Sequence, residues 1–252
     1  MTGDKTVFVI EIAGVPIEIR CSYALNKSFF EDYLSDSEPV ITIEPESGDL
    51  DRIRESFNSA ADAEGRERRN YSRCFLENNA IHDLIADKLV SRNVLLMHGS
   101  ALCMDGEAYI FTAPSGTGKS THTRLWREVF GERAIIINDD KPMLRVAEDG
   151  ITVYGTPWNG KHHLGCNCSA PLKAIVSLRR DSFNHIAPME HTEAFQILLR
   201  QVYSARSADG MRKILDLDQQ IIKLVSFYRL GCNMEKEAAL TAYNGMNAGK
   251  QQ

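Results

Sequence analysis

The stretch "FTAPSGTGKSTHTRLW" at residues 111–126 limits the possible folds of this chain more than any other segment. Ala113, Gly118, Lys119 and Ser120 give it the spacing A-x-x-x-x-G-K-S, which differs from the phosphate-binding loop pattern G-x-x-x-x-G-K-[ST] at the first position. The strand-like run "EAYIFTA" leads into the loop, and the amphipathic run "STHTRLWREVF" follows it. Strand, loop and helix in this order are the context that a phosphate-binding loop requires.

The glycines and the helix start predict how this loop would hold a ligand. Gly116 and Gly118 let consecutive backbone N–H groups turn inward around phosphates, and the following helix presents its positive N-terminal end. Lys119 offers a charge to the β and γ phosphates, and Ser120 offers a hydroxyl to Mg²⁺. The alternative is a chance match in an ordinary turn. The residues predicted to bind ATP are Ser115, Gly116, Thr117, Gly118, Lys119, Ser120 and Thr121.

A second segment, "ERAIIINDDKPMLR", has the features of the acidic side of a metal site. Ile135, Ile136 and Ile137 predict a buried strand, and Asp139 and Asp140 follow at its carboxyl end. Two adjacent carboxylates can divide the work, because one can hold Mg²⁺ while the other accepts a proton from an attacking hydroxyl. The alternative is a solvated turn, since Asn, Asp and Pro all favour turns.

Composition limits the classes of function that this chain can have. The chain has 252 residues, 43% of them hydrophobic and 25% charged, which is enough for one large domain or two small ones. A formal net charge of -5 argues against a nucleic-acid partner, which needs clustered Lys and Arg. No apolar run approaches the length of a membrane helix, and the start "MTGDKTVFVIEIAG" does not resemble a secretory signal. We expect a cytoplasmic protein with no membrane partner, and a homo-oligomer is possible.

The six cysteines are scattered through the chain, which is not the pattern of a small secreted scaffold. We expect them to be reduced thiols and not a disulfide framework.

The pattern of the chain changes near residue 92. Residues 1–92 contain a pair of alternating runs, "TVFVIEIAG" and "VPIEIRCS", that predict a β-hairpin, a further strand at "PVITIEP", and three helical segments, so we predict a small α+β domain. Residues 93–246 contain short strands around glycine turns and then helices, and form the predicted catalytic domain. The tail at 247–252 is predicted to be disordered.

Two quoted segments together carry a family resemblance. "MHGSALCMDGEAYIFTAPSGTGKST" followed by "INDD" resembles the catalytic domain of HPr kinase/phosphorylase, in which a His-Gly pair precedes the loop strand and a double Asp follows the loop helix. The resemblance is good over residues 93–145 and implies an α/β fold of the P-loop kinase type related to phosphoenolpyruvate carboxykinase, with a mixed sheet and flanking helices. It further implies that Asp139 is the general base, that Asp140 and Ser120 bind Mg²⁺, and that His98 lies beside the base.

The downstream segment departs from that family. Where HPr kinases carry their own signature and a helix that grips the HPr protein, this chain has "VYGTPWNGKHHLGCNCSAPLKAIVSLRRD". The chain is more similar to the HPr-kinase-like proteins encoded in many bacteria, a few of which are associated with peptide modification and phosphorylate serine side chains. This departure concerns the substrate more than the chemistry.

The segment "GTPWNGKHHLGCNCSAP" predicts a loop, because Gly and Pro interrupt any regular element. Lys161 could neutralise a transferring phosphoryl group and Trp158 could shape an acceptor pocket; the alternative is a surface loop with a buried tryptophan. At the end of the strand "PLKAIVSLRR", Arg179 or Arg180 could reach a phosphate or could simply be exposed. Zinc is a further possibility, although the ligand spacing is not a standard one. Its candidate ligands are His162, His163, Cys166 and Cys168.

These observations predict an ATP-dependent kinase that uses Mg²⁺ to phosphorylate a hydroxyl, that of serine in particular, in a protein, a peptide or a small molecule. Two alternatives stay open: a nucleotide-binding regulatory module without transfer, and a bifunctional kinase/phosphorylase. The residues predicted to act in catalysis are Asp139, His98, Lys119 and Lys161.

Overall fold

The structure is a computed structural model that describes residues 5–160 and 163–248. The chain divides into two compact units, Met1–Leu89 and Val90–Gln252. Each unit has its own sheet, and each is described by itself below.

The first unit begins with the predicted β-hairpin. Ala13 and Gly14 have positive φ angles of 50° and 68°, the left-handed pair that a tight hairpin turn needs. The hairpin strands are antiparallel, and the third strand pairs in parallel with the second. The strands of this sheet are β1 (Thr6–Ile12), β2 (Val15–Cys21) and β3 (Ile41–Ile43).

Two long helices pack together in this unit through a small apolar core. Leu50 and Ile53 of the first contact Leu76 and Ala80 of the second. Of the three helical segments predicted within residues 1–92, the first, "NKSFFEDYL", is instead a short α-helix and a 3-10 turn, and the other two are helices as predicted. The helical elements are α1 (Leu25–Phe29), η1 (Glu31–Tyr33), α2 (Ser47–Ala63) and α3 (Arg73–Leu89).

The second unit is built on a mixed sheet of nine strands, counted over the described residues. Its order is β4-β8-β9-β10-β6-β5-β7, with β12 pairing β10 and β11 pairing β12. Strands β6, β10 and β12 run parallel, so their carboxyl ends lie at one edge of the sheet. The strands are β4 (Val94–Leu96), β5 (Ser100–Met104), β6 (Glu107–Thr112), β7 (Ala134–Asn138), β8 (Met143–Ala147), β9 (Gly150–Tyr154), β10 (Ser169–Arg180), β11 (His185–Pro188) and β12 (Ser226–Cys232).

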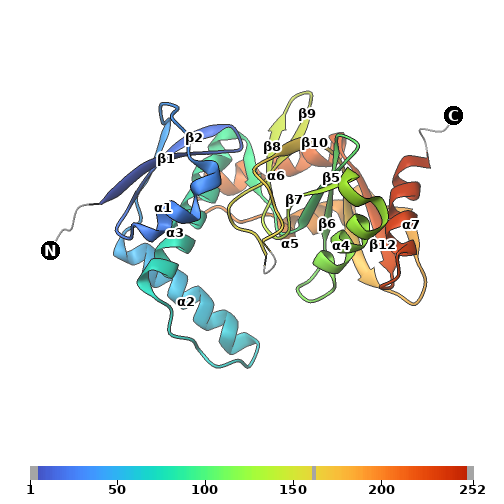
Figure 1. Cartoon of the computed structure of the whole chain (residues 1–252), viewed down its shortest axis with the longest axis horizontal. Helices are drawn as coiled ribbons and strands as arrows, with labels where there is room; N and C mark the ends of the chain where they lie inside the picture. Colours follow the sequence, from blue (N-terminus) through green and yellow to red (C-terminus); the bar gives the residue numbers. More distant parts are fainter. Residues whose placement is uncertain (1–4, 161–162, 249–252) are drawn as a thin grey trace. The chain divides into compact units, whose positions relative to one another are not determined.

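Helices cover both faces of this sheet, because the central strands are apolar on both sides. On β6, Tyr109 and Phe111 join one core while Ala108 and Ile110 join the other, as the two-residue period of a strand requires. The first core includes α4 and α7, which lie together in Figure 1, and the second includes α5 and α6. The predicted mixed α/β architecture with flanking helices is therefore confirmed. The helices are α4 (Lys119–Phe130), α5 (His191–Gln201), α6 (Ala208–Leu224) and α7 (Glu237–Asn247), with 3-10 turns η2 (Val90–Arg92) and η3 (Gly131–Arg133).

Parts of this unit were not predicted from the sequence. The hairpin of β8 and β9 was missed, although Asp149 and Gly150 are a turn signal between two alternating runs, and the short strand β11 was missed as well. The strand predicted at 135–137 is present as part of β7. It is not fully buried, because β7 is an edge strand of the sheet and the side chain of Ile135 is 51% exposed. None of the described helices is both long and apolar enough to cross a membrane.

Candidate functional site

The glycine loop lies between β6 and α4, as the sequence predicts. Gly116 and Gly118 have φ angles of 76° and 125°, which L side chains rarely adopt, so glycine is needed at both positions. Ala113 does not have a positive φ, and its methyl group is buried in the core beneath α4. This explains why alanine can replace glycine at the first position of the pattern.

Lys119 begins α4 and bends back into the loop. Its Nζ donates to the Ala113 carbonyl oxygen at 3.1 Å, and the residue is 9% exposed. Burial lowers the pKa of this amine, and the negative charge of Asp140 acts in the opposite direction. By contrast, Ser115, Gly116 and Ser120 are exposed at the mouth of the loop.

The two aspartates follow β7 and are attached to the start of β5 by their backbone. Ser100 Oγ donates to the Asp139 carbonyl oxygen at 2.9 Å, and the Gly99 N–H donates to the Asp140 carbonyl oxygen at 2.9 Å. Since β5 also pairs with β6, the aspartates and the glycine loop are attached to the same part of the sheet.

Asp139 is 3% exposed, so the alternative of a fully solvated turn is wrong for this residue. Its Oδ1 accepts a hydrogen bond from the Gly160 N–H. Its Oδ2 is buried and has no hydrogen-bond partner within the described part of the chain. The described fold therefore leaves hydrogen-bonding capacity of this carboxylate oxygen unused.

Asp140 lies in a more open and more positive environment than Asp139. His98 Nε2 lies 3.5 Å from its Oδ1. Burial alone would raise the pKa of the Asp140 carboxyl, but the hydrogen bond from His98 and the charges of Lys141 and Lys119 outweigh burial, so the pKa lies below its usual value. Asp140 is therefore ionised at neutral pH, and His98, Lys119 and Asp140 share one electrostatic environment.

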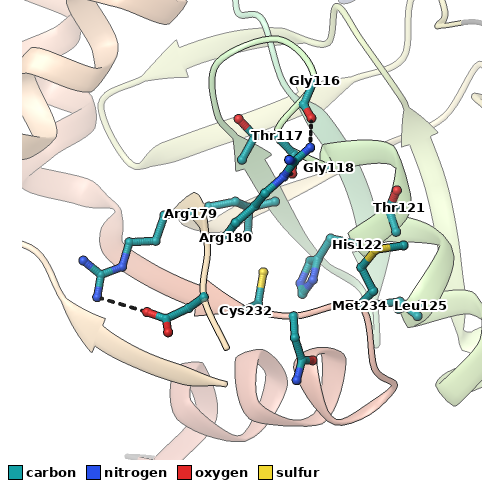
Figure 2. A pocket seen from close by; sticks show the side chains of 13 residues that line it. Gly116, Thr117, Gly118, Thr121, His122, Leu125, Arg179, Arg180, Cys232 and Met234 are labelled. Atoms are coloured by element: carbon teal, nitrogen blue, oxygen red, sulfur yellow. Dashed lines mark hydrogen bonds and ion pairs between the residues drawn. The ribbon is translucent and has the colours of Figure 1, made fainter. Parts of the chain in front are cut away.

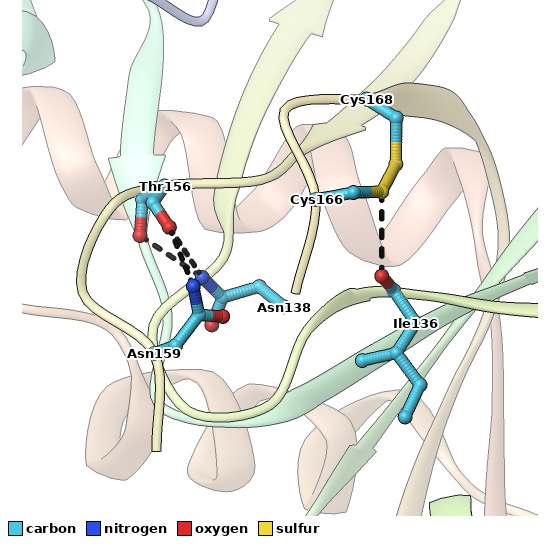
Figure 3. The surroundings of a disulfide bond; sticks show 6 residues. All are labelled: Ile136, Asn138, Thr156, Asn159, Cys166 and Cys168. Carbon is cyan, nitrogen blue, oxygen red and sulfur yellow. Dashed lines mark hydrogen bonds between the residues drawn. A yellow bond between two sulfur atoms is a disulfide. The ribbon is translucent and has the colours of Figure 1, made fainter. Parts of the chain in front are cut away.

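Asn138 organises the turn that carries these aspartates, and sequence reasoning gave it no role. Its Oδ1 accepts from the N–H groups of Asp140 and Lys141 at 2.9 and 2.6 Å. Its Nδ2 donates to the Thr156 carbonyl and hydroxyl oxygens at 3.1 and 3.0 Å (Figure 3). The Asn immediately before a double Asp was the available signal, because Asn side chains often bond the backbone two residues on.

Cys166 and Cys168 form a disulfide, so the expectation of reduced thiols is wrong for these two residues. The Cys168 N–H donates to the Cys166 carbonyl oxygen at 2.9 Å, and this tight turn places the two Cα atoms 5.4 Å apart, within disulfide range (Figure 3). The remaining four cysteines are free thiols. Disulfide sulfurs are not thiolate ligands, and the described residues contain no group of three His, Cys, Asp or Glu placed for a metal, so the zinc interpretation loses its cysteine pair.

The other residues predicted on this loop have different outcomes. Lys161 and His162 lie outside the described residues. His163 is exposed and has a φ of 48°. Trp158 is 7% exposed, and its carbonyl oxygen accepts from Asn138 Nδ2 at 3.4 Å.

A cavity of about 490 Å³ adjoins the glycine loop (Figure 2). Arg180 closes one wall, because its Nη2 donates to the Gly116 carbonyl oxygen at 2.6 Å and its Nε to that of Thr117 at 3.3 Å. The arginine considered for a phosphate contact thus holds the loop backbone. The lining residues come from the loop, from α4, and from the ends of β10 and β12: Gly116, Thr117, Gly118, Thr121, His122, Leu125, Leu178, Arg179, Arg180, Asp181, Cys232, Asn233 and Met234.

Comparison with known proteins finds no relative in sequence and a distant likeness among solved structures. No protein-family model matches the sequence, and no curated protein matches it. Among solved structures, the HPr(Ser) kinase/phosphatase from Coxiella burnetii aligns with 62% of this chain and 98% of its own, at 10% identity and a TM-score of 0.37. This likeness is too distant to assign a family.

Proposed function

We propose that the chain is an ATP-dependent kinase that phosphorylates a hydroxyl group with the help of Mg²⁺. The observation that supports this proposal best is the arrangement around the glycine loop. A buried lysine bends into the loop, and two carboxylates of unlike surroundings lie at the end of β7. The carboxylate of Asp140 is ionised among positive charges, and that of Asp139 has a buried oxygen without a hydrogen-bond partner among the described residues.

The roles follow from these surroundings. The N–H groups of the loop and the start of α4 bind the phosphates, and Lys119 moves from the Ala113 carbonyl oxygen to the β and γ phosphates. Ser120 and Asp140 would hold Mg²⁺, which would neutralise charge on the phosphates; one carboxylate with a hydroxyl is typical of such a site. His98 orients Asp140.

Asp139 acts as the general base in this proposal. Its Oδ2 accepts the proton of the acceptor hydroxyl, the hydroxyl oxygen forms a bond to the γ-phosphorus, and the bond from that phosphorus to the β-γ bridging oxygen breaks, so ADP leaves. Lys161, directly after Gly160, supplies a further charge to the transferred group. The acceptor we propose is a serine hydroxyl of a protein or peptide, or a small-molecule hydroxyl.

Calorimetry with ATP and Mg²⁺ tests the loop. Lys119→Ala should abolish measurable binding while the thermal unfolding temperature changes little, because the amine acts on the ligand. Lys223→Ala, an exposed lysine on α6, is the control and should bind ATP as the wild type does. Unchanged affinity in Lys119→Ala would exclude the phosphate-binding role.

Transfer is tested with γ-labelled ATP and a panel of serine-containing peptides and small alcohols. Label on an acceptor supports a kinase. Binding without turnover on every acceptor would favour a regulatory nucleotide-binding module. Release of the group from the phosphorylated product by inorganic phosphate would identify a bifunctional kinase/phosphorylase.

A further inference from the structure

The cavity beside the glycine loop lies on the opposite flank of β6 from the aspartates. In the sheet order, β5 and β7 lie on one side of β6, and β10 and β12 lie on the other. The proposed function places the terminal phosphate toward Asp139 and Asp140, at the end of β7. The other half of a nucleotide held over the loop therefore extends toward the carboxyl ends of β10 and β12, where open parallel strands commonly bind ligands.

His122 supplies a buried polar group that the fold itself does not satisfy. It lies one turn into α4, is 2% exposed, and is among the residues that line the cavity. Its Nε2 accepts a hydrogen bond from Trp126 Nε1 at 3.0 Å, so the neutral ring carries its proton on Nδ1. Burial lowers the pKa of this ring to about 3, so it stays neutral at physiological pH.

The Nδ1–H of His122 has no hydrogen-bond partner in the described structure. A buried donor without a partner is unfavourable unless something else accepts its hydrogen bond. Figure 2 shows the ring in the middle of the cavity wall, between Cys232 and Met234. Because His122 lines the cavity, a molecule bound there could accept the hydrogen bond that the described fold leaves unmade.

Several of the remaining lining residues suit a neutral, partly apolar molecule. Leu125 and Leu178 give an apolar floor, and Met234, 73% exposed, is an adaptable side chain at the rim. Arg179 lies 3.7 Å from the Asp181 carboxylate, which offsets its charge. A volume of about 490 Å³ lies within the range of about 300–1,000 Å³ typical of small-molecule pockets.

We propose that this cavity binds the ribose and base of the nucleotide, with the His122 Nδ1–H as hydrogen-bond donor and Met234 packed against the base. This inference rests on the proposed function, since the phosphates of the same molecule occupy the glycine loop. It assigns nucleotide recognition to residues beyond the loop itself.

Calorimetry with two probes tests this site: ATP, and inorganic triphosphate, which has the phosphates without a nucleoside. Wild type should bind ATP more tightly than triphosphate. His122→Gln keeps an acceptor near Trp126 but removes the donor at the Nδ1 position, so ATP affinity should fall by about 2- to 12-fold, the range of one hydrogen bond, with triphosphate affinity unchanged. Met234→Ala should likewise lower the affinity for ATP and leave the affinity for triphosphate unchanged, whereas Met234→Leu should retain the ATP affinity of the wild type.

A matched variant separates the ligand contact from the fold. His122→Asn keeps an N–H donor near the Nδ1 position but loses the acceptor for Trp126. It should therefore lower the thermal unfolding temperature and keep more of the preference for ATP over triphosphate than His122→Gln does.

The possible failures are distinguishable. If wild type binds ATP and triphosphate equally and His122→Gln changes neither affinity, the nucleoside site is excluded while the loop assignment stands. If wild type binds neither probe, the proposed function fails and this inference fails with it. If His122→Gln lowers the affinities for ATP and for triphosphate equally, His122 supports the glycine loop and does not contact the nucleoside.

Discussion

Asp139 and Asp140 are neighbours in sequence, but their side chains have unlike surroundings. Asp139 accepts a hydrogen bond from the Gly160 N–H, and its other oxygen is buried without a partner in the described part of the chain, whereas Asp140 lies beside His98 and is ionised. Two carboxylates in unlike environments are suited to two different tasks, proton acceptance and metal binding. This contrast is the residue-level basis of the proposed mechanism.

Replacement of Asp139 by Asn should separate transfer from binding. Asn keeps the shape of the side chain but cannot accept the proton, so transfer should fall by about 10²- to 10⁴-fold while ATP affinity stays near that of wild type. Asp140→Asn is the matched comparison and should weaken the dependence of ATP affinity on Mg²⁺. If Asp139→Asn loses Mg²⁺-dependent binding and retains transfer, the two roles are exchanged.

Asp218 on α6 should make the stability of the protein depend on pH. It is fully buried, neither carboxylate oxygen has a hydrogen-bond partner within the described residues, and burial raises its pKa to about 7 from 3.8. A raised pKa means that the contribution to stability is present below pH 4 and is lost as pH rises through about 7. The loss is at most about 4 kcal/mol, from roughly three pKa units.

Urea unfolding at pH 5 and pH 8 measures this effect. Asp218→Asn cannot ionise, so its free energy of unfolding should fall less between these pH values than that of wild type. Asp216→Asn changes an exposed carboxyl on the same helix and should leave the pH dependence as in wild type. Parallel pH profiles for wild type and Asp218→Asn would show that Asp218 does not titrate in this range.

At the scale of elements, the loop between β9 and β10 positions the proposed base. The Gly160 N–H donates to Asp139, the Gly155 N–H donates to the Cys168 carbonyl oxygen at 3.0 Å, and the Cys166 N–H to that of Ile137 at 3.1 Å. The loop thus lies against the end of β7 through backbone hydrogen bonds. A substitution in this loop should therefore alter the position of the Asp139 side chain.

Gly160→Ala tests this coupling. An added Cβ would lie 2.9 Å from Asp139 Oδ2, closer than carbon and oxygen normally approach, so the carboxylate must shift. A displacement of this kind should lower transfer by about 10- to 100-fold and leave ATP affinity within about twofold. Gly150→Ala is the control, because no atom of the described residues beyond its chain neighbours lies within 4 Å of its added Cβ. If Gly160→Ala retains full transfer activity, phosphoryl transfer does not depend on the position of the Asp139 carboxylate.

At the scale of the whole molecule, the apolar cores follow the division into two units. The cores on the two faces of the mixed sheet consist of residues from 90 onward, whereas the core between α2 and α3 consists of residues before 90. The loop, the aspartates and the cavity all belong to the second unit.

We therefore expect a fragment of residues 90–252 to fold and to bind ATP. It should unfold in one cooperative transition, as a domain with its own cores does, and its ATP affinity should lie within a few-fold of that of the full chain. Circular dichroism and calorimetry provide the measurements. A fragment without a cooperative transition would show that the first unit is required for the second to fold.

Features determined by neighbouring residues were predictable from the sequence. The β1–β2 hairpin, the glycine loop and the helix after it depend on turn chemistry and periodicity within about 20 residues, and all three are present. Asp139 and Asp140 were predictable as candidates because they directly follow a strand-like apolar run. The order of the strands was not predictable, since β10 pairs with β9, β6 and β12, which lie far apart in the chain.

The surroundings of each candidate residue depend on contacts between distant segments, and a linear pattern does not contain them. Sequence alone placed Lys119, Asp139 and the loop glycines in one plausible motif. The fold was needed to bring Gly160 to Asp139, Arg180 to the loop carbonyls, and His122 to a cavity formed by β10 and β12. Local propensity acts through a few neighbouring residues, whereas burial, hydrogen-bond partners and pKa shifts arise where the sheet brings separate segments together.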